Sequence, residues 1–339
     1  MADPCTATAY WSIPPGPGEL RAEALPTPGP GQALVRARHS GISRGTELLV
    51  YAGLVPPTQA ERMRAPLQSG DFPGPVKYGY LSVGTVEQGP PDWVGREVFC
   101  LHPHQDAYVA PVSALTALPD GVPARRAVLA GAVETAVNAV WDAAPRLGDR
   151  VAVVGAGLIG SAVAGVLRRF PLERLQLIDI DPARATVAAS FGLDFAHPEQ
   201  ALAGCDIVVH ASGNGAGLSR CLELAGDEAE VIELSWYGSR ETSVNLGADF
   251  HSRRLAIRAS QVGSVSAARR ARRTPADRLG LALEVLRDDA YDVLLTGSSP
   301  FAELPAVMSR LASGELDAIC HVIDYPTTHP DPTDPPGEA

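Results

Sequence analysis

An apolar strand, a glycine-rich turn and a helix follow one another from residue 151, and this run limits the fold more than any other feature. The four apolar residues 151–154 precede Gly155, Gly157 and Gly160, which are spaced as GxGxxG. An all-apolar strand is typical of a parallel sheet buried on both faces. The first glycine allows a tight turn, the second lets the backbone approach a pyrophosphate, and the third lets helix and strand pack closely. The run therefore predicts a dinucleotide site rather than a membrane span.

An acidic residue follows at the place that such a site requires. Asp179 closes the next apolar run, about 20 residues after Gly160. A carboxylate there accepts the adenosine ribose hydroxyls and repels a 2′-phosphate, so NAD(H) is favoured over NADP(H). Arg184 leaves the alternative open, because its guanidinium could admit a 2′-phosphate. The predicted cofactor contacts are Gly155, Ala156, Gly157, Leu158, Ile159, Gly160, Asp179, Arg184, Ser212 and Gly213.

The chain divides into a β-rich first part and an alternating second part. Short apolar runs at 33–38, 81–87 and 97–101 lie between proline and glycine turns, which is typical of a small barrel or sandwich. From residue 150, strands at 151–157, 175–181, 205–213 and 229–235 alternate with helices expected at 161–170, 182–191 and 217–225. This alternation predicts parallel βαβ units and an α/β fold. The length of 339 residues suits two domains.

The order of these parts resembles the medium-chain dehydrogenase/reductase family. Residues 39–47, HSGISRGTE, resemble the family's early substrate loop, and residues 39–57 resemble its bacteriochlorophyllide a dehydrogenase branch. The resemblance implies a discontinuous GroES-like β-rich catalytic domain, 1–130 and 266–325, around a Rossmann doubly wound parallel sheet, 131–265. The remaining segment, 326–339, is rich in proline and acid and has no apolar anchor, so we expect disorder there.

The zinc ligands of that family have few counterparts in this chain. Ser43 or Arg44 stands at the first ligand position, and Tyr80 and Leu81 stand where histidine or glutamate is usual. Only Glu134, at the third position, matches a ligand type. Zinc needs three protein ligands and an open position, so zinc is not expected and no metal ligand is predicted. The alternative is a relocated site made of Cys100, His102, His104 and Glu134.

Without zinc, a side chain must donate a proton when a carbonyl is reduced and accept a proton when an alcohol is oxidised. The resemblance places several polar residues near the lost metal position, and the catalytic candidates are Tyr80, His102, His104, Glu134 and Thr46. The predicted substrate contacts are Ser43, Trp236, Tyr237 and His251.

Charge and composition limit the remaining possibilities. The net charge of −11 disfavours nucleic acid as a partner, and the start of the chain has no apolar signal segment, so we predict a cytoplasmic protein without a membrane partner. The resemblance implies a homodimer acting on a small molecule. We expect an NAD(H)-dependent, zinc-independent oxidoreductase of a secondary alcohol or ketone. The alternatives are a quinone or enoyl (C=C) reductase that uses NAD(P)H, and a non-catalytic nucleotide-binding relative.

Overall fold

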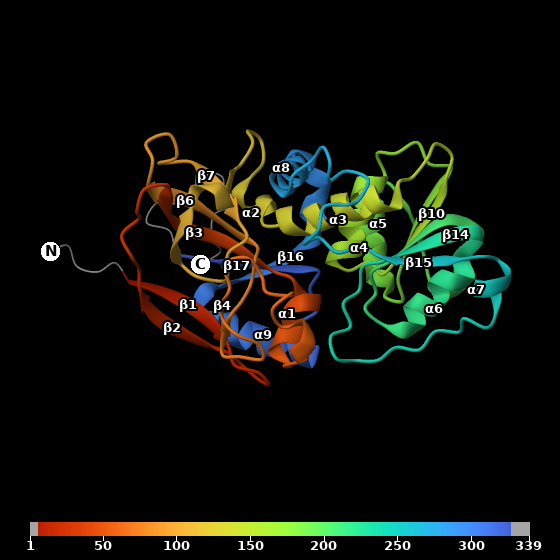
Figure 1. Cartoon of the computed structure of the whole chain (residues 1–339), viewed down its shortest axis with the longest axis horizontal. Coiled ribbons are helices and arrows are strands. Elements are labelled where there is room, and N and C mark those ends of the chain that lie inside the picture. The colour runs from red at the N-terminus through yellow and green to blue at the C-terminus, as the bar shows by residue number, and fades with distance from the viewer. Residues whose placement is uncertain (1–5, 327–339) are drawn as a thin grey trace.

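Three sheets organise residues 6–326, which are the part of the chain that this computed structural model describes (Figure 1). The segment predicted to be disordered, 326–339, lies outside the described residues except for residue 326. One sheet is entirely parallel and the other two contain antiparallel pairs. This combination confirms the predicted α/β class with a separate β-rich part.

The parallel sheet has six strands in the order β12-β11-β10-β13-β14-β15. The strands are β10 (Arg150–Val154), β11 (Arg174–Ile178), β12 (Asp194–Ala196), β13 (Cys205–His210), β14 (Ala225–Glu233) and β15 (Ala256–Ala259). The helices of this part are α3 (Ala130–Ala143), α4 (Leu158–Leu167), α5 (Ala185–Phe191), α6 (Gly215–Leu224) and α7 (Asp249–Ser252). The strand order is that of a doubly wound sheet, in which ligands bind where the order reverses, beside β10 and β13.

The β-rich part holds the two other sheets. A seven-stranded sheet has the order β16-β17-β3-β6-β7-β9, with β8 paired to β3, and a four-stranded sheet has the order β2-β1-β5-β4. Their strands are β1 (Thr6–Ser12), β2 (Glu19–Ala24), β3 (Gln32–Ile42), β4 (Ser69–Gly70), β5 (Val76–Lys77), β6 (Ser82–Gln88), β7 (Glu97–Cys100), β8 (Ala107–Pro111), β9 (Leu115–Ala117), β16 (Leu295–Pro300) and β17 (Cys320–Asp324). The helices here are α1 (Arg44–Tyr51), α2 (Ala124–Ala127), α8 (Pro275–Val285) and α9 (Leu304–Ser313).

The chain returns to its first sheet after it leaves the parallel one. Strand β17 pairs antiparallel with β3, and β16 pairs parallel with β17. Figure 1 shows these blue strands beside the orange ones, with the green parallel sheet on the other side of α3. This return agrees with a discontinuous β-rich domain, although the exact residue boundaries of the two domains stay a prediction.

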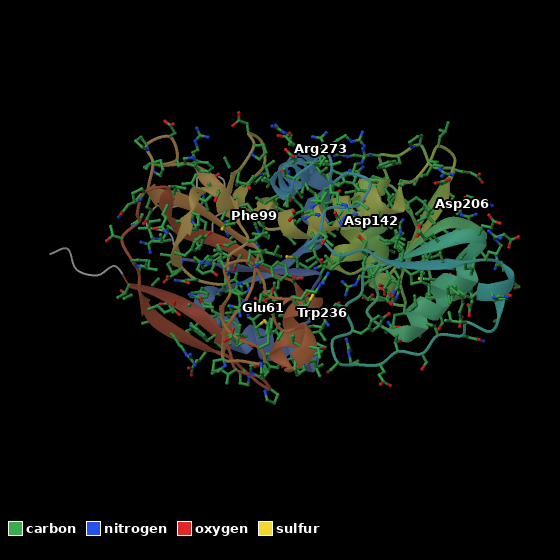
Figure 2. The ribbon with its side chains drawn as sticks, viewed as in Figure 1. Glu61, Phe99, Asp142, Asp206, Trp236 and Arg273 are labelled. Carbon is green, nitrogen blue, oxygen red and sulfur yellow. The ribbon has the colours of Figure 1, made fainter. Side chains whose placement is uncertain are left out.

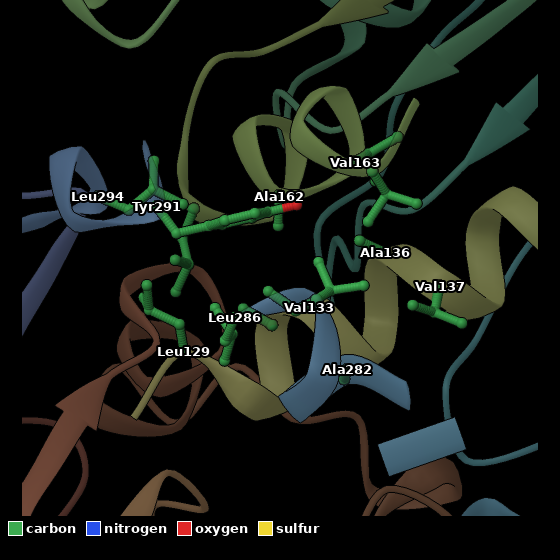
Figure 3. Close-up of a cluster of buried hydrophobic side chains, with 14 of the residues drawn as sticks. Leu129, Val133, Ala136, Val137, Ala162, Val163, Ala282, Leu286, Tyr291 and Leu294 are labelled. Atoms are coloured by element: carbon green, nitrogen blue, oxygen red, sulfur yellow. The ribbon is translucent and has the colours of Figure 1, made fainter. Parts of the chain in front are cut away.

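The two parts share one apolar core around α3. Figure 3 shows Val133 and Val137 of α3 beside Val163 of α4 and Tyr291, which follows α8. Gly165 of α4 makes this packing possible, because a Cβ there would lie 2.7 Å from the Tyr291 hydroxyl oxygen. The junction between the parts is therefore packed. No helix within residues 6–326 combines the length and the hydropathy needed to cross a bilayer.

Candidate active site at the domain junction

Two of the three motif glycines are required by close packing, and the third faces open space. A Cβ on Gly155, whose φ is +105°, would lie 2.6 Å from the Ser212 amide nitrogen. A Cβ on Gly160 would lie 1.8 Å from the Gly155 carbonyl oxygen, so α4 lies directly against the turn. Gly157 is the N-cap of α4 and meets nothing within 4 Å. Helix α4 consequently begins at Leu158, three residues before the predicted start, and its free N–H groups point toward that space.

A cavity of about 580 Å³ opens at this turn and is lined by both parts of the molecule. Many predicted cofactor, substrate and catalytic residues line it: Gly155, Gly157, Leu158, Ile159, Asp179, Arg184, Ser212, Gly213, Ser43, Thr46 and Trp236. Sequence reasoning missed other lining residues, among them Arg44, Arg220, Arg240, Ser235, Ala318 and Ile319. Of the added arginines, Arg44 pairs with Asp317 at 2.8 Å and Arg220 pairs with Glu223 at 2.7 Å.

Asp179 holds the glycine turn in place. One carboxylate oxygen accepts the Ala156 amide at 2.7 Å, and the other accepts the Asp181 amide at 2.9 Å. Ala156 is fully buried and does not line the cavity; it contributes only the amide that Asp179 binds. Asp179 still lines the cavity, so its carboxylate remains available to ribose hydroxyls.

Arg184 joins the two parts through an acidic residue. Its guanidinium pairs with Asp181 at 3.1 Å and with Asp317, and Asp317 also pairs with Arg44 at 2.8 Å. Burial would raise the pKa of Asp317, but the two arginines outweigh burial and lower it below its usual range. Arg184 extends from the parallel-sheet part, whereas Arg44 and Asp317 belong to the β-rich part, so this cluster ties the parts together beside the cavity.

Tyr80 lies beside the serine and threonine that line the β-rich wall. Burial, followed by the charge of Glu47, raises the pKa of Tyr80 to about 12, and hydrogen bonds with the Ser43 and Thr46 hydroxyls oppose that rise. The phenol is therefore neutral at ordinary pH and can donate a hydrogen bond. Tyr80, Ser43 and Thr46 form one polar group, although only Ser43 and Thr46 line the cavity itself.

His104 lies behind this polar group rather than at the cavity, contrary to its expected catalytic position. The side chain is 1% exposed; its Nε2 lies 3.0 Å from a Glu47 oxygen and its Nδ1 lies 2.7 Å from the Ser40 hydroxyl. The other Glu47 oxygen accepts the Ser43 amide at 2.7 Å. His104 therefore supports the segment that carries Ser43 and is not among the residues that line the cavity.

His102, another predicted catalytic residue, is also buried and is not among the residues that line the cavity. Its ring stacks on Tyr108 with 3.7 Å between centroids, and its Nδ1 lies 2.9 Å from the Pro103 carbonyl oxygen. Strand β7 ends at Cys100, so Cys100, His102 and His104 of the alternative relocated metal site do not lie on one strand. Within residues 6–326, no cluster of three or more His, Cys, Asp or Glu side chains is arranged to hold a metal ion.

Burial of His102 predicts acid sensitivity. Desolvation, the largest cause, lowers the pKa of His102 to about 3, whereas an unfolded histidine titrates near 6.5. Between these values only the unfolded chain takes up the proton, so the free energy of unfolding falls as pH decreases from about 6.5 to about 3, by up to about 5 kcal/mol. We expect His102→Phe, which keeps the ring stack, to reduce this loss in urea unfolding measured at several pH values. His197→Gln is the control, and equal pH slopes for wild type and His102→Phe would contradict the prediction.

Three further predicted residues do not line the cavity. Glu134 of α3 is buried, and its carboxylate pairs at 3.0 Å with the guanidinium of Arg278 of α8. The predicted catalytic carboxylate is therefore already paired with a cation. The Tyr237 hydroxyl donates to Glu233 at 3.1 Å, and His251 is exposed on α7. None of the three is among the cavity-lining residues, because their side chains are directed elsewhere.

Trp236 is the aromatic residue that does reach the junction. Figure 2 labels it beside α1, between the two parts. It lines the cavity and also packs on a small apolar cluster of the β-rich part that contains Val50, Val55 and Tyr78. Nearby, the Ser239 amide donates to the Leu54 carbonyl at 2.9 Å. The segment after β14 thus closes one end of the cavity.

Solved structures share this two-part fold over nearly their whole length. An alcohol dehydrogenase from Escherichia coli complexed with NADH superposes with a TM-score of 0.72 at 16% identity, covering 94% of this chain and 99% of that one. A candidate zinc-binding dehydrogenase from Sinorhizobium meliloti bound to NADP gives 0.74 at 16% identity, covering 94% and 99%. The chain therefore has the fold of the medium-chain dehydrogenases/reductases, which confirms the predicted resemblance at the level of fold.

A narrower sequence similarity covers part of the chain. Over 82 residues the chain is 38% identical to 2-desacetyl-2-hydroxyethyl bacteriochlorophyllide A dehydrogenase from Cereibacter sphaeroides. The stretch is 23% of this chain and 21% of that protein, so the match spans about a fifth of the relative's length. No protein-family model matches the chain.

Proposed function

We propose that the protein is an NAD(H)-dependent oxidoreductase that interconverts a secondary alcohol and a ketone without catalytic zinc. The observation that carries the proposal is one cavity that joins a glycine turn with Asp179 to the polar wall formed by Ser43 and Thr46. The fold neighbours that are dehydrogenases bound to NADH or NADP support the oxidoreductase class.

The residues at the turn fit a dinucleotide. Gly157 faces open space where a pyrophosphate would approach the backbone, and the N-terminus of α4 supplies N–H groups for it. Asp179 would hold the adenosine ribose, and its carboxylate favours NAD(H) over NADP(H). The dinucleotide, when bound, supplies the hydride chemistry. Arg184 keeps NADP(H) as the competing choice, although Asp181 and Asp317 already pair with it.

The polar wall would bind the oxygen of the substrate. The Ser43 and Thr46 hydroxyls line the cavity, and the neutral Tyr80 phenol lies against them. Hydrogen-bond donors aimed at a carbonyl stabilise the negative charge that develops on its oxygen during reduction. Trp236 would cover the reacting region and exclude water.

The residues at the inherited metal position do not fit zinc. Ser43 and Tyr80 are not zinc ligands, and the one carboxylate of the matching set, Glu134, is paired with Arg278. We therefore assign no step of the proposed reaction to a metal.

Turnover of an alcohol panel tests the proposal. We expect oxidation of secondary alcohols with NAD⁺, at least about tenfold better in kcat/KM than with NADP⁺, since a repelled phosphate costs about 1.4 kcal/mol or more. Activity should stay within about twofold after dialysis against a chelator. Activity that returns only on adding zinc would overturn the zinc-independent assignment.

The same assay separates the two alternatives. Preferential reduction of an enone or quinone with NADPH would favour the C=C reductase, which Arg184 near the ribose position would permit. Binding of NADH without turnover of any substrate would favour the non-catalytic relative. The cytoplasmic location and the homodimer remain part of the proposal.

A further inference from the structure

Two neighbouring strands of the parallel sheet end in a buried histidine–carboxylate pair. His210 is the last residue of β13 and Glu233 the last of β14, and the two are register partners. The Nδ1 atom of His210 lies 2.8 and 2.9 Å from the two Glu233 carboxylate oxygens. The histidine has no exposed surface. An acid–base pair is thus fixed at the carboxyl edge of the sheet, where the cavity opens.

Ser212 connects this pair to the cavity. Its hydroxyl oxygen lies 2.6 Å from Nε2 of His210, and the residue lines the cavity. Gly217 of α6 leaves room for the contact, since a Cβ there would lie 2.1 Å from the serine oxygen and 2.9 Å from Nε2. The serine, the histidine and the carboxylate therefore form one hydrogen-bonded chain that reaches the cavity at Ser212. Ser235, which also lines the cavity, lies with its hydroxyl oxygen 3.3 Å from Nδ1 of His210.

The hydrogen bonds define the direction of the chain. Because the Glu233 carboxylate can only accept a hydrogen bond, the neutral imidazole carries its proton on Nδ1 and donates it to Glu233. Nε2 then accepts a hydrogen bond from the Ser212 hydroxyl. The serine oxygen then offers lone pairs to a donor in the cavity. When the imidazole takes up a second proton, Nε2 donates to the serine, whose own proton becomes available to the cavity.

The surroundings keep Glu233 ionised. Burial raises the pKa of Glu233, but the hydrogen bonds from His210 and from the Ser235 amide outweigh burial and lower it below its usual range. The Tyr237 hydroxyl donates to the same carboxylate at 3.1 Å. On α6, Cys221 faces Glu233, and burial raises the pKa of this thiol well above its usual value. The groups facing the pair are thus neutral, and an imidazolium would be balanced by Glu233 alone.

We propose that Ser212, His210 and Glu233 form a proton relay that serves a hydroxyl bound in the cavity. The relay rests on the proposed function. During oxidation, an alcohol held at the Ser43 and Thr46 hydroxyls would pass its proton to the Ser212 oxygen while the serine proton moves to Nε2 of His210, and a bound oxidised dinucleotide would accept the hydride. Serine is regenerated in the same step, and the imidazolium, held by Glu233, later returns its proton to solvent. Reduction runs the steps in reverse.

Three variants and one matched control test the relay. Ser212→Ala removes the cavity end, His210→Gln removes the acid–base group, and Glu233→Gln keeps the shape without the charge. Ser299→Ala is the control, because Ser299 lies 3.0 Å from Nε2 of another buried histidine, His321, outside the cavity. NADH binding by fluorescence checks that each variant retains its site, and kcat and KM for the alcohol are measured from pH 5 to 10.

We expect Ser212→Ala to lower kcat by about 100-fold or more, the usual scale of general acid–base catalysis. Its KM should change only a few-fold, and its profile of kcat against pH should differ from that of the wild type. A role limited to binding would instead raise KM and leave the pH profile unchanged. Unchanged kcat and pH profile in Ser212→Ala, with an active wild type, would overturn the relay alone. A wild type that neither binds NADH nor turns over would overturn the proposed function and the relay with it.

Nitrogen-15 spectra of histidine-labelled protein give a readout that does not depend on turnover. The His210 signals are assigned by their loss in His210→Gln. The relay predicts a neutral imidazole with its proton on Nδ1, and a shift of the Nε2 signal in Ser212→Ala but not in Ser299→Ala. A proton on Nε2 in the neutral state would contradict the direction of the chain.

Discussion

A protein carrying Gly157→Val is expected to bind NADH at least about a hundredfold more weakly than the wild type, a loss of about 2.7 kcal/mol. Gly157 has a φ of −77°, which valine adopts easily, and nothing lies within 4 Å of its Cβ position. The added isopropyl group therefore fits the fold but occupies the space through which a pyrophosphate reaches the backbone. We expect the melting temperature to change by no more than about 2 °C.

Two other glycines serve as comparisons for this variant. Gly160→Ala would place a Cβ 1.8 Å from the Gly155 carbonyl oxygen, so it should lower stability as well as binding. Gly280 lies on α8 with open space around its Cβ position and does not line the cavity, so Gly280→Val should leave NADH binding unchanged. Wild-type affinity in Gly157→Val would mean that the dinucleotide does not approach this turn.

Loss of Arg278 is expected to cause the largest change in stability. Its guanidinium is 2% exposed, and two of its nitrogens donate to one Glu134 oxygen at 3.0 and 3.1 Å. It also donates to Asn138 and to the carbonyl groups of Val262 and Ser264. Arg278→Leu leaves the Glu134 carboxylate buried without its counter-ion, which typically costs about 3–5 kcal/mol. Urea unfolding at pH 7 measures the difference.

The double variant separates the lost ion pair from lost packing. Replacing both partners, Glu134→Leu with Arg278→Leu, removes the unpaired charge, so we expect it to recover at least about half of the lost free energy. Recovery should be incomplete, because the carbonyl groups of Val262 and Ser264 still lose a donor. A single variant that loses less than about 1 kcal/mol, or a double variant less stable than the single one, would contradict a structural role for this pair.

The spacing of Gly155, Gly157 and Gly160 predicted the glycine turn, because the geometry of this turn depends on residues that are close in sequence. Gly155, Gly160 and Asp179 lie together through one βαβ unit, and the contacts of the turn involve this unit and the end of β13. The spacing could not show that Asp317, far along the chain, pairs with Arg184. That contact depends on the chain's return to its first sheet.

The histidines show where residue type was an insufficient guide. His102 and His104 were predicted as catalytic candidates, but β7 ends at Cys100 and both side chains are buried outside the set that lines the cavity. His210 and Glu233 received no predicted role, although each is the last residue of its strand. In the strand order of a doubly wound sheet, β13 and β14 are neighbours. The polar residues at their ends could therefore have been predicted to lie together.

Fluorescence titration of the wild-type protein with NADH and NADPH is the most direct test of the central claim that the cavity is an NAD(H) site. The account predicts saturable binding of NADH at a 1:1 ratio, with NADPH at least about tenfold weaker, a difference of about 1.4 kcal/mol. Absence of saturable binding by either dinucleotide would contradict it.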